Sequence, residues 1–212
     1  MKNTVKLDSF YGNDLSIAMA AWTSTAAELT PERTARVREF VISLAQERHT
    51  VPFEHTYLNF QFHTDIATHI HVLKHRIGVS VSSQSFRWKE QETDGYIPDD
   101  WDIFAANELY KFQVEAFEKY HAMIDYLVSN GMTRKRAKES ARYFLPYSTM
   151  LHYSVSMNFH SFAHFVGLRA DQHAQMEIRE LAKSMLHQVY KTGAFRAAIE
   201  GWNLKQYLDL DV

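Results

Sequence analysis

Cysteine is absent from this 212-residue sequence. Disulfides, zinc-thiolate sites, iron–sulfur clusters and any reaction with a cysteine nucleophile are therefore excluded. Long apolar runs are also missing, both for a membrane span and for the apolar region of a signal peptide near the amino terminus. These absences predict a cytoplasmic protein that does not enter a membrane.

A surplus of positive charge is missing too. The chain has 23 lysines and arginines against 25 acidic residues, a formal net charge of −2. No global basic field would hold a nucleic-acid polymer, so a nucleotide ligand would need a few local cations, which favours a small anion. Hydrophobic residues make up 46% of the chain, as in a folded protein. Histidine is also plentiful, with 12 residues. Imidazole can bind metals, shuttle protons or donate hydrogen bonds to phosphate.

Hydrophobic periodicity and capping residues predict the secondary structure. The predicted strands cover residues 57–63 and 147–157, with a serine-rich loop at 77–85. The predicted helices cover residues 15–29, 30–48, 66–76, 104–128, 133–145, 158–169 and 171–190. Together they predict one α+β domain over residues 1–212, mostly helical with a small mixed or antiparallel sheet.

One candidate site surrounds the predicted serine-rich loop. Lys74, His75 and Arg76 precede it, and Arg87 follows its last serine, Ser85. Cations and hydroxyls gathered around one loop are what phosphate binding requires. A solvated loop beside helix-terminal cations explains the same pattern equally well, because the glycine spacing of a P-loop is missing.

The histidines form a second candidate site. His160 and His164 are four residues apart and share one helix face, which suits a metal ion. Without a His-Glu-x-x-His motif, ordinary hydrogen-bonded histidines are the favoured interpretation. His49, Glu54 and His55 could form a proton relay, although a network that ties helix to strand is the simpler reading. The basic run at residues 134–138 is interpreted as a solvated face.

Four segments taken together resemble the flavin-dependent thymidylate synthases. Residues 48–55 resemble that family's His-x-x-Pro-Phe-Glu-His segment, and residues 168–175 its Leu-Arg-x-Asp-x-His-Ala-Gln segment. Lys74-His75-Arg76 with Ser85-Phe86-Arg87 resembles its signature of Arg-His-Arg, seven residues, Ser, one residue and Arg, and residues 12–15 match its usual start. The four segments occur in the family's order and span nearly the whole chain, which makes them far more specific jointly than singly.

The sequence departs from the family pattern at several positions. Lys74 replaces the first arginine of the signature, and eight residues rather than seven separate Arg76 from Ser85. Ser82-Ser83 stands where the family often has Asn-Glu. His71 replaces a nucleotide-binding glutamine, and His160 and His164 replace an arginine and an asparagine of the flavin site.

The resemblance implies a fold, a cofactor and a set of site residues. The fold would be that of the family, with FAD as cofactor and dUMP as substrate. Arg169 would be catalytic, since its fixed charge beside the uracil ring would stabilise negative charge developing there. The FAD site would comprise Ser24, His49, Val51, Lys74, His75, Arg76, Ser83, Asn158, His160, His164 and His173. The dUMP site would comprise His71, Lys74, Ser83, Gln84, Ser85, Arg87, Arg142 and Arg169.

The resemblance also implies a reaction that fits the missing cysteine. Members methylate dUMP to dTMP with methylenetetrahydrofolate as one-carbon donor, NADPH as reductant and reduced flavin as hydride donor. They are homotetramers whose sites combine several subunits. Two alternatives stay open: a non-catalytic flavin- or nucleotide-binding member of the family, and a metal-dependent nucleotide hydrolase that uses the histidine clusters.

Overall fold

The computed structural model describes residues 1–25, 28–91 and 95–208. Its internal contacts divide the chain into two compact units. The first unit comprises Met1–Thr4, His63–Val72 and Ser82–Tyr153, and the second comprises Val5–Phe62, Leu73–Val81 and Ser154–Val212. The single domain expected from the sequence therefore stays a prediction.

A four-stranded antiparallel sheet has the strand order β1-β2-β4-β3. Its strands are β1 (Thr4–Tyr11), β2 (Tyr57–Asp65), β3 (Val79–Ser83) and β4 (Met150–Met157). The fold prediction, a mostly helical α+β chain with a small sheet, is confirmed. In β2 the predicted alternation holds, because Leu58, Phe60 and Phe62 are buried.

The sequence did not predict two of these strands. Residues 79–83 were expected in a loop but form β3, and no strand was expected at residues 4–11. Both segments expose most of their side chains, so they lack the buried apolar face that marks a strand in the sequence. These segments become strands because a neighbouring strand supplies partners for their backbone hydrogen-bonding groups, which the local sequence does not reveal.

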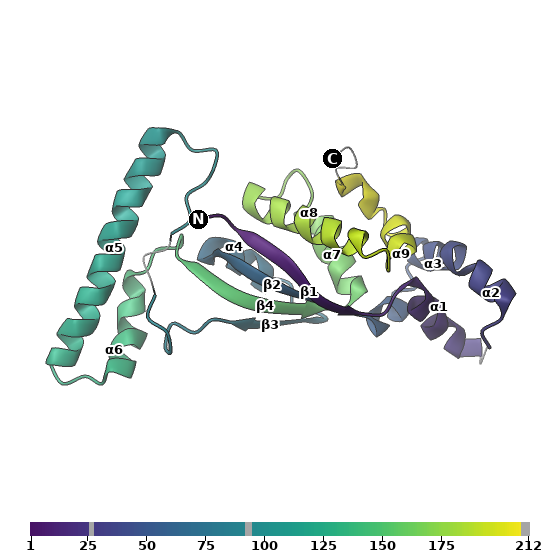
Figure 1. Ribbon diagram of the computed structural model, residues 1–212, viewed down its shortest axis with the longest axis horizontal. Coiled ribbons are helices and arrows are strands. Elements are labelled where there is room, and N and C mark those ends of the chain that lie inside the picture. The colour runs from purple at the N-terminus through teal and green to yellow at the C-terminus, as the bar shows by residue number, and fades with distance from the viewer. Residues whose placement is uncertain (26–27, 92–94, 209–212) are drawn as a thin grey trace. The chain divides into compact units, whose positions relative to one another are not determined.

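Most of the helices belong to the second unit, where Gln188 of α8 bonds to the backbone of Val5 and Leu7 in β1. Figure 1 shows α8 running beside β1. Its core is aromatic: Phe159 and Phe195 stack with ring centroids 5.2 Å apart, and Phe60 and Phe162 stack at 6.0 Å. The helical elements are α1 (Asp14–Trp22), η1 (Thr23–Thr25), α2 (Pro31–Ala35), α3 (Val37–Gln46), η2 (Val51–His55), α7 (Phe159–Arg169), α8 (Met176–Lys191), α9 (Arg196–Gly201) and η4 (Leu204–Tyr207).

Several predicted helices have different bounds: the helix expected at 66–76 ends at Leu73, and the helix expected at 133–145 divides into Arg134–Ala141 and Arg142–Phe144. The helix expected at 15–29 becomes α1 and η1, and residues 26–27 lie outside the described part of the chain. The helix expected at 30–48 is interrupted because Arg36 leaves helical geometry, with φ −102° and ψ 3°. The helix expected from Asp171 begins at Met176, because the Asp171 carboxylate accepts a hydrogen bond from the His173 N–H and forms a turn.

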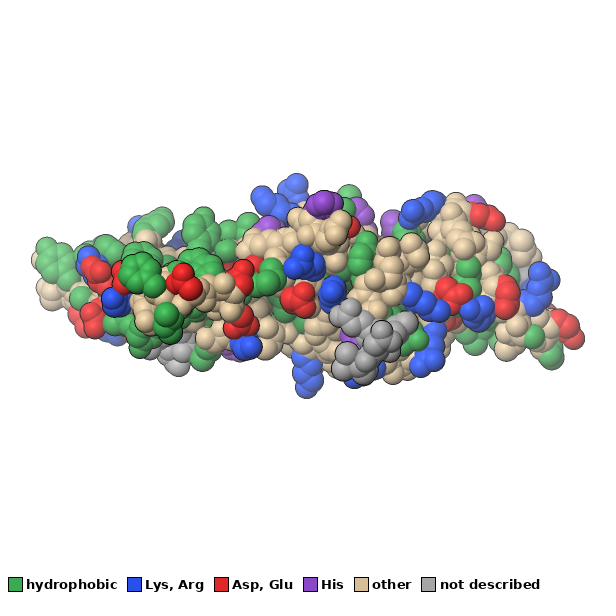
Figure 2. All heavy atoms as spheres, turned by 90° about the horizontal axis from the view of Figure 1, so that it is seen from above, with side chains coloured by type: hydrophobic (Ala, Val, Ile, Leu, Met, Phe, Trp, Pro, Cys, Tyr) green, Lys and Arg blue, Asp and Glu red, His purple; other side chains and the backbone are tan. Residues whose placement is uncertain are grey.

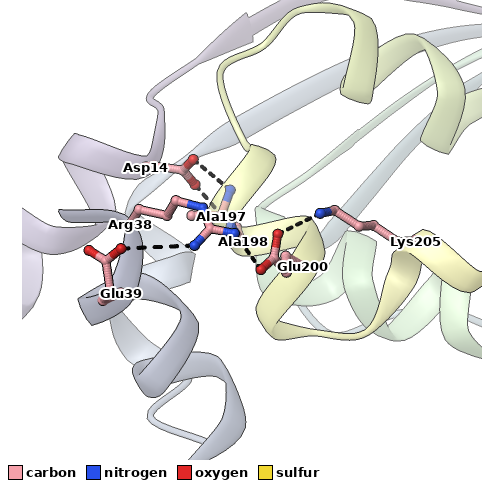
Figure 3. A network of polar contacts seen from close by, with 7 residues as sticks. All are labelled: Asp14, Arg38, Glu39, Ala197, Ala198, Glu200 and Lys205. Carbon is pink, nitrogen blue, oxygen red and sulfur yellow. Dashed lines mark hydrogen bonds and ion pairs between the residues drawn. The ribbon is translucent and has the colours of Figure 1, made fainter. Parts of the chain in front are cut away.

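Asp14 ties α1 to α9 within the second unit, as Figure 3 shows. Its carboxylate accepts hydrogen bonds from the backbone N–H groups of Ala197 and Ala198, at 2.8 and 3.0 Å. Beside it, Glu200 accepts from both Arg38 and Lys205, each at 2.5 Å. The two carboxylates thus join segments that are more than 150 residues apart.

The first unit contains α5 (Ile103–Ser129), α6 (Arg134–Ala141), η3 (Arg142–Phe144) and most of α4 (Ile66–Leu73). Asp102 and Thr133 cap α5 and α6, which lie side by side in Figure 1. Tyr120 and Ile124 of α5 pack in a buried cluster with Ala137 and Ala141 of α6.

Helix α5 exposes several large hydrophobic side chains among charged ones. Figure 2 shows hydrophobic side chains gathered over the region of α5, at the left of the view. The exposed large hydrophobic residues of this helix are Ile103, Phe104, Tyr110, Phe112 and Tyr126. Within the described residues no helix is long and apolar enough to cross a membrane.

Candidate active site

A cavity of about 540 Å³ lies in the second unit. The segment after α4 forms one wall and α7 forms another, with Glu54 of η2 at its edge. The residues that line it are Glu54, Lys74, His75, Arg76, Ile77, Gly78, Val79, Asn158, His160, Ser161, His164, Leu168 and Arg169. It thus gathers seven of the predicted site residues from segments more than 80 positions apart in the sequence.

Hydrogen bonds fix the two main walls of this cavity to each other. Asn158 caps α7, with its side-chain oxygen accepting from the Ser161 N–H at 2.8 Å. The Ser161 hydroxyl in turn donates to the Ile77 carbonyl at 2.8 Å. Gly78 follows with φ +65°, and a Cβ there would collide with the side chains of Ser161 and Asn158. Only glycine allows this close approach of the two walls.

The charge of the cavity wall favours an anion. Lys74, Arg76 and Arg169 contribute three positive charges, against one carboxylate, that of Glu54. Glu54 is itself paired, because its Oε1 lies 3.1 Å from Nδ1 of His160. Guanidinium and ammonium groups grouped in this way suit a phosphate or a diphosphate.

Arg169 and His75 meet inside the cavity. Arg169 Nε donates a hydrogen bond to His75 Nε2 at 3.0 Å. The His75 ring also packs edge-on against Phe165, with centroids 4.7 Å apart. Burial, the charge of Arg169 and the nearby His164 lower the pKa of His75 to about 4. His75 is therefore a neutral imidazole at physiological pH.

Three other predicted flavin residues line a second cavity of about 450 Å³ in the same unit. They are Ser24, His49 and Val51, all exposed. Arg48 beside them has the left-handed backbone conformation, with φ 61°, and its guanidinium lies 5.0 Å from the centre of the Trp202 ring. The His49 ring lies 3.4 Å from the Glu47 carboxylate.

His173 lies away from both cavities. It is exposed in the turn between α7 and α8, where its backbone N–H bonds to Asp171. The two cavities and this turn are therefore separate places within the unit. That these three places bind one flavin stays a prediction.

The remaining predicted residues belong to the first unit. Ser83 lies 2.9 Å from Nε2 of His69, a ring whose pKa is lowered by burial. Gln84 exchanges two hydrogen bonds with the backbone of His152, at 2.8 and 3.1 Å. His71 is half-buried on α4, and Arg142 is exposed at the start of η3.

Arg87, the predicted phosphate ligand, is held by a carboxylate. Its Nε donates to Glu139 Oε1 at 2.5 Å, and the Glu139 side chain is 17% exposed. The hydrogen bond from Arg87 lowers the pKa of Glu139, and Arg136 contributes further. The N–H of Arg87 also bonds to Ser85 Oγ at 3.3 Å. An incoming phosphate at Arg87 would therefore meet Glu139.

Sequence reasoning missed several residues of these sites. Gly78, Ser161 and His69 were assigned no role, because their partners are distant in the sequence. Glu139 directly follows the basic run at residues 134–138, which was interpreted as solvated, and an acidic residue next to that run was the available signal. Glu54 was considered only with His49 and His55, whereas it contacts His160.

Metal binding finds little support in this arrangement. Across the described ranges, no three histidine or acidic side chains come together closely enough to hold a metal ion. His160 is paired with Glu54, and His164 lies with its ring centre 6.0 Å from that of His75. His160 and His164, which share one helix face, therefore contact different residues.

Comparison with known proteins places this chain among thymidylate-forming enzymes. The family described as thymidylate synthase complementing protein (Thy1) matches residues 7–192. A flavin-dependent thymidylate synthase of Pseudothermotoga lettingae is 31% identical over 195 residues, covering 89% of this chain and 85% of the relative. One from Thermosipho melanesiensis is 31% identical over 193 residues, covering 85% and 82%.

A solved structure confirms the fold independently. The UMP/dUMP methylase PolB from Streptomyces cacaoi, bound with 5-Br dUMP, superposes with a TM-score of 0.79. The match covers 98% of this chain and 97% of that chain at 24% sequence identity. At that identity the similarity establishes the common fold.

Proposed function

Because the chain belongs to the family of flavin-dependent thymidylate synthases, we propose that it converts dUMP to dTMP by reductive methylation. Enzymes of this family are methyltransferases that use FAD as cofactor. Methylenetetrahydrofolate would supply the one-carbon unit and NADPH the electrons. The observation that carries this proposal is the positively lined cavity in which Arg169 is held by a neutral histidine. A reaction without cysteine needs such fixed charge to activate the uracil ring.

The main cavity fits the cofactor chemically. Lys74 and Arg76 supply charge for the FAD diphosphate, and Asn158, His160 and His164 can offer hydrogen bonds along α7. Ser24, His49 and Val51, around the second cavity, and His173 and Ser83 would complete the flavin site in the assembled protein. Bound flavin would supply hydride chemistry that no side chain of the chain provides.

The substrate would be bound by fixed cations and by the end of β3 with the residues that follow it. Arg87 and Arg142 are apt for the dUMP phosphate, with Ser83, Gln84, Ser85, His71 and Lys74 around the nucleotide. Arg169 would lie against the uracil edge and stabilise negative charge as carbon 5 becomes nucleophilic. A similar fold in a methylase solved with 5-Br dUMP supports this choice of substrate.

A homotetramer with shared sites is part of the proposal. The large hydrophobic side chains that α5 exposes support association, because exposed apolar groups of this size are common at subunit interfaces. Two cavities in one chain, each with part of the predicted flavin site, fit sites completed by other subunits. The cytoplasmic location also stays a prediction.

Tritium release from 5-tritiated dUMP tests the function directly. The purified protein is assayed with FAD, NADPH and methylenetetrahydrofolate, and each is omitted in turn. Release that requires all three supports the proposal. A yellow protein that binds FAD and dUMP but releases no tritium would identify a binding-only member of the family, whose altered signature segment at Ser82-Ser83 no longer supports turnover. A colourless protein that hydrolyses nucleotides, and loses this activity when a chelator is added, would support the metal-dependent alternative.

A further inference from the structure

The contact between Arg169 and His75 restricts the chemical state of both residues. A guanidinium has five N–H donors and no acceptor, and it keeps its proton in proteins. Arg169 Nε lies 3.0 Å from His75 Nε2, so that ring nitrogen must present a lone pair. His75 must then be neutral and carry its single proton on Nδ1.

The groups that face His75 favour this state. From α7 come the guanidinium of Arg169, the ring of His164 at 6.0 Å and the apolar ring of Phe165 at 4.7 Å. From its own segment come two neighbouring cations, Lys74 and Arg76. The carboxylate on the cavity wall, Glu54, is bonded to His160. Positive and apolar neighbours both disfavour a second proton on the ring.

We propose that His75 is a positioning residue, which holds the Arg169 guanidinium in place by accepting a hydrogen bond from its Nε. This role rests on the proposed function of Arg169. The bond uses Nε alone, so the terminal Nη groups can face a ligand in the cavity. An arginine side chain carries about 2 kcal/mol of rotamer entropy, and a fixed acceptor removes much of that freedom before the substrate arrives. Preorganised charge stabilises a transition state without reorganisation during the reaction.

The proposal also explains why a histidine suits this position. A carboxylate in the same place would pair with the guanidinium and cancel the charge that the reaction needs. A protonated histidine would repel it. A neutral imidazole orients Arg169 while leaving its positive charge intact, and its Nδ1–H can still donate to an anionic ligand.

Nuclear magnetic resonance of the ligand-free, full-length protein with ¹⁵N-labelled histidine tests the tautomer without any turnover. His75→Gln assigns the His75 signals. We expect a neutral ring with the proton on Nδ1, unchanged as the pH falls from 8 to 5. In Arg169→Lys and Arg169→Met the Nε donor is gone, so the signals should shift and the ring should titrate at higher pH. A ring protonated at pH 6, a proton on Nε2, or no response to either Arg169 variant would overturn the proposal.

Kinetics of the FAD-loaded enzyme then test the positioning role. His75→Leu removes the acceptor and should lower kcat by roughly 100-fold, the scale of a misplaced catalytic group. In His75→Gln the amide oxygen can accept from Arg169 Nε, so most of kcat should return. Combining His75→Leu with Arg169→Lys should add little to the loss from Arg169→Lys alone, because His75 acts through Arg169.

FAD affinity, measured by flavin fluorescence, separates this role from direct contact with the cofactor. We expect the loss of kcat in His75→Leu to persist at saturating FAD and to exceed any loss of FAD affinity. Additive losses in the double variant, or a fall in FAD affinity that accounts for the loss of kcat, would overturn the role. If wild-type protein showed no thymidylate synthesis but retained the Nδ1–H tautomer and its dependence on Arg169, the proposed function would fail while the contact itself stood.

Discussion

The half-buried histidine His75 should make the stability of the protein depend on pH in a way that one substitution removes. Its pKa is lowered from 6.5 to about 4 in the folded protein. Between these values the unfolded chain binds a proton that the folded protein does not, so the free energy of unfolding falls as the pH decreases from about 7 toward 4. His75→Gln keeps an acceptor for Arg169 but has no proton to bind.

The size of the effect follows from the two pKa values. A gap of two to three units corresponds to about 3 kcal/mol when fully developed. Between pH 7 and pH 5, about 2 kcal/mol of it appears, because at pH 5 the unfolded histidine is almost fully protonated and the folded one is almost fully neutral. Carboxylates and the other histidines contribute equally to both proteins and cancel in the comparison.

Urea denaturation of both proteins at pH 7 and pH 5 measures the difference. Wild type should lose about 2 kcal/mol more than His75→Gln between the two pH values. Equal m-values are the control that both proteins unfold in the same way. If both lost the same stability, His75 would not be a neutral ring in the folded protein, and its role as an acceptor for Arg169 would be refuted.

Four further predictions concern other parts of the chain. Asp14→Ala should lower the free energy of unfolding by about 2 kcal/mol in urea denaturation, because two backbone N–H groups of α9 lose their acceptor; a change below about 0.5 kcal/mol would show that the contact is unimportant. Glu139→Gln should tighten dUMP binding by roughly tenfold in calorimetry, because it removes the carboxylate that competes for Arg87; weaker binding would mean that Glu139 orients Arg87 instead. Gly78→Ala should destabilise the protein by about 1–3 kcal/mol in thermal unfolding and lower FAD affinity, and an unchanged melting temperature would contradict the close approach of Gly78 to Ser161 and Asn158. Arg169→Ala should reduce turnover far more than FAD affinity, and equal losses in both would rule out its proposed role.

Local signals predicted much of the secondary structure. Asn13 and Asn158 cap α1 and α7, and such a cap is a local signal because it joins residues only three positions apart. The strand at Tyr57–Asp65 was predicted because its apolar side chains alternate. The bounds failed where a single residue such as Arg36 leaves helical geometry, because periodicity averages over a window and does not register one residue.

For the candidate site, the sequence proposed a set of residues but not the geometry that joins them. Four motifs identified the family, because short segments carry that signal even when their partners are unknown, and the resemblance implied the candidate residues. Nothing in those motifs indicates that Glu139 holds Arg87 or that Glu54 holds His160. Each of these pairs joins segments more than 50 residues apart, and no local pattern encodes such a contact.

By itself, then, the sequence determined the chemistry open to this protein: no cysteine nucleophile, local cations for an anion, and the motifs of one enzyme family. Only the tertiary structure decided that Arg169 meets His75, that most of the predicted flavin residues divide between two cavities, and that β3 replaces a loop. Composition and motifs are properties of residues and short segments, and they can be read along the chain. Contacts, burial and pKa shifts depend on which distant segments meet, and folding alone brings those segments together.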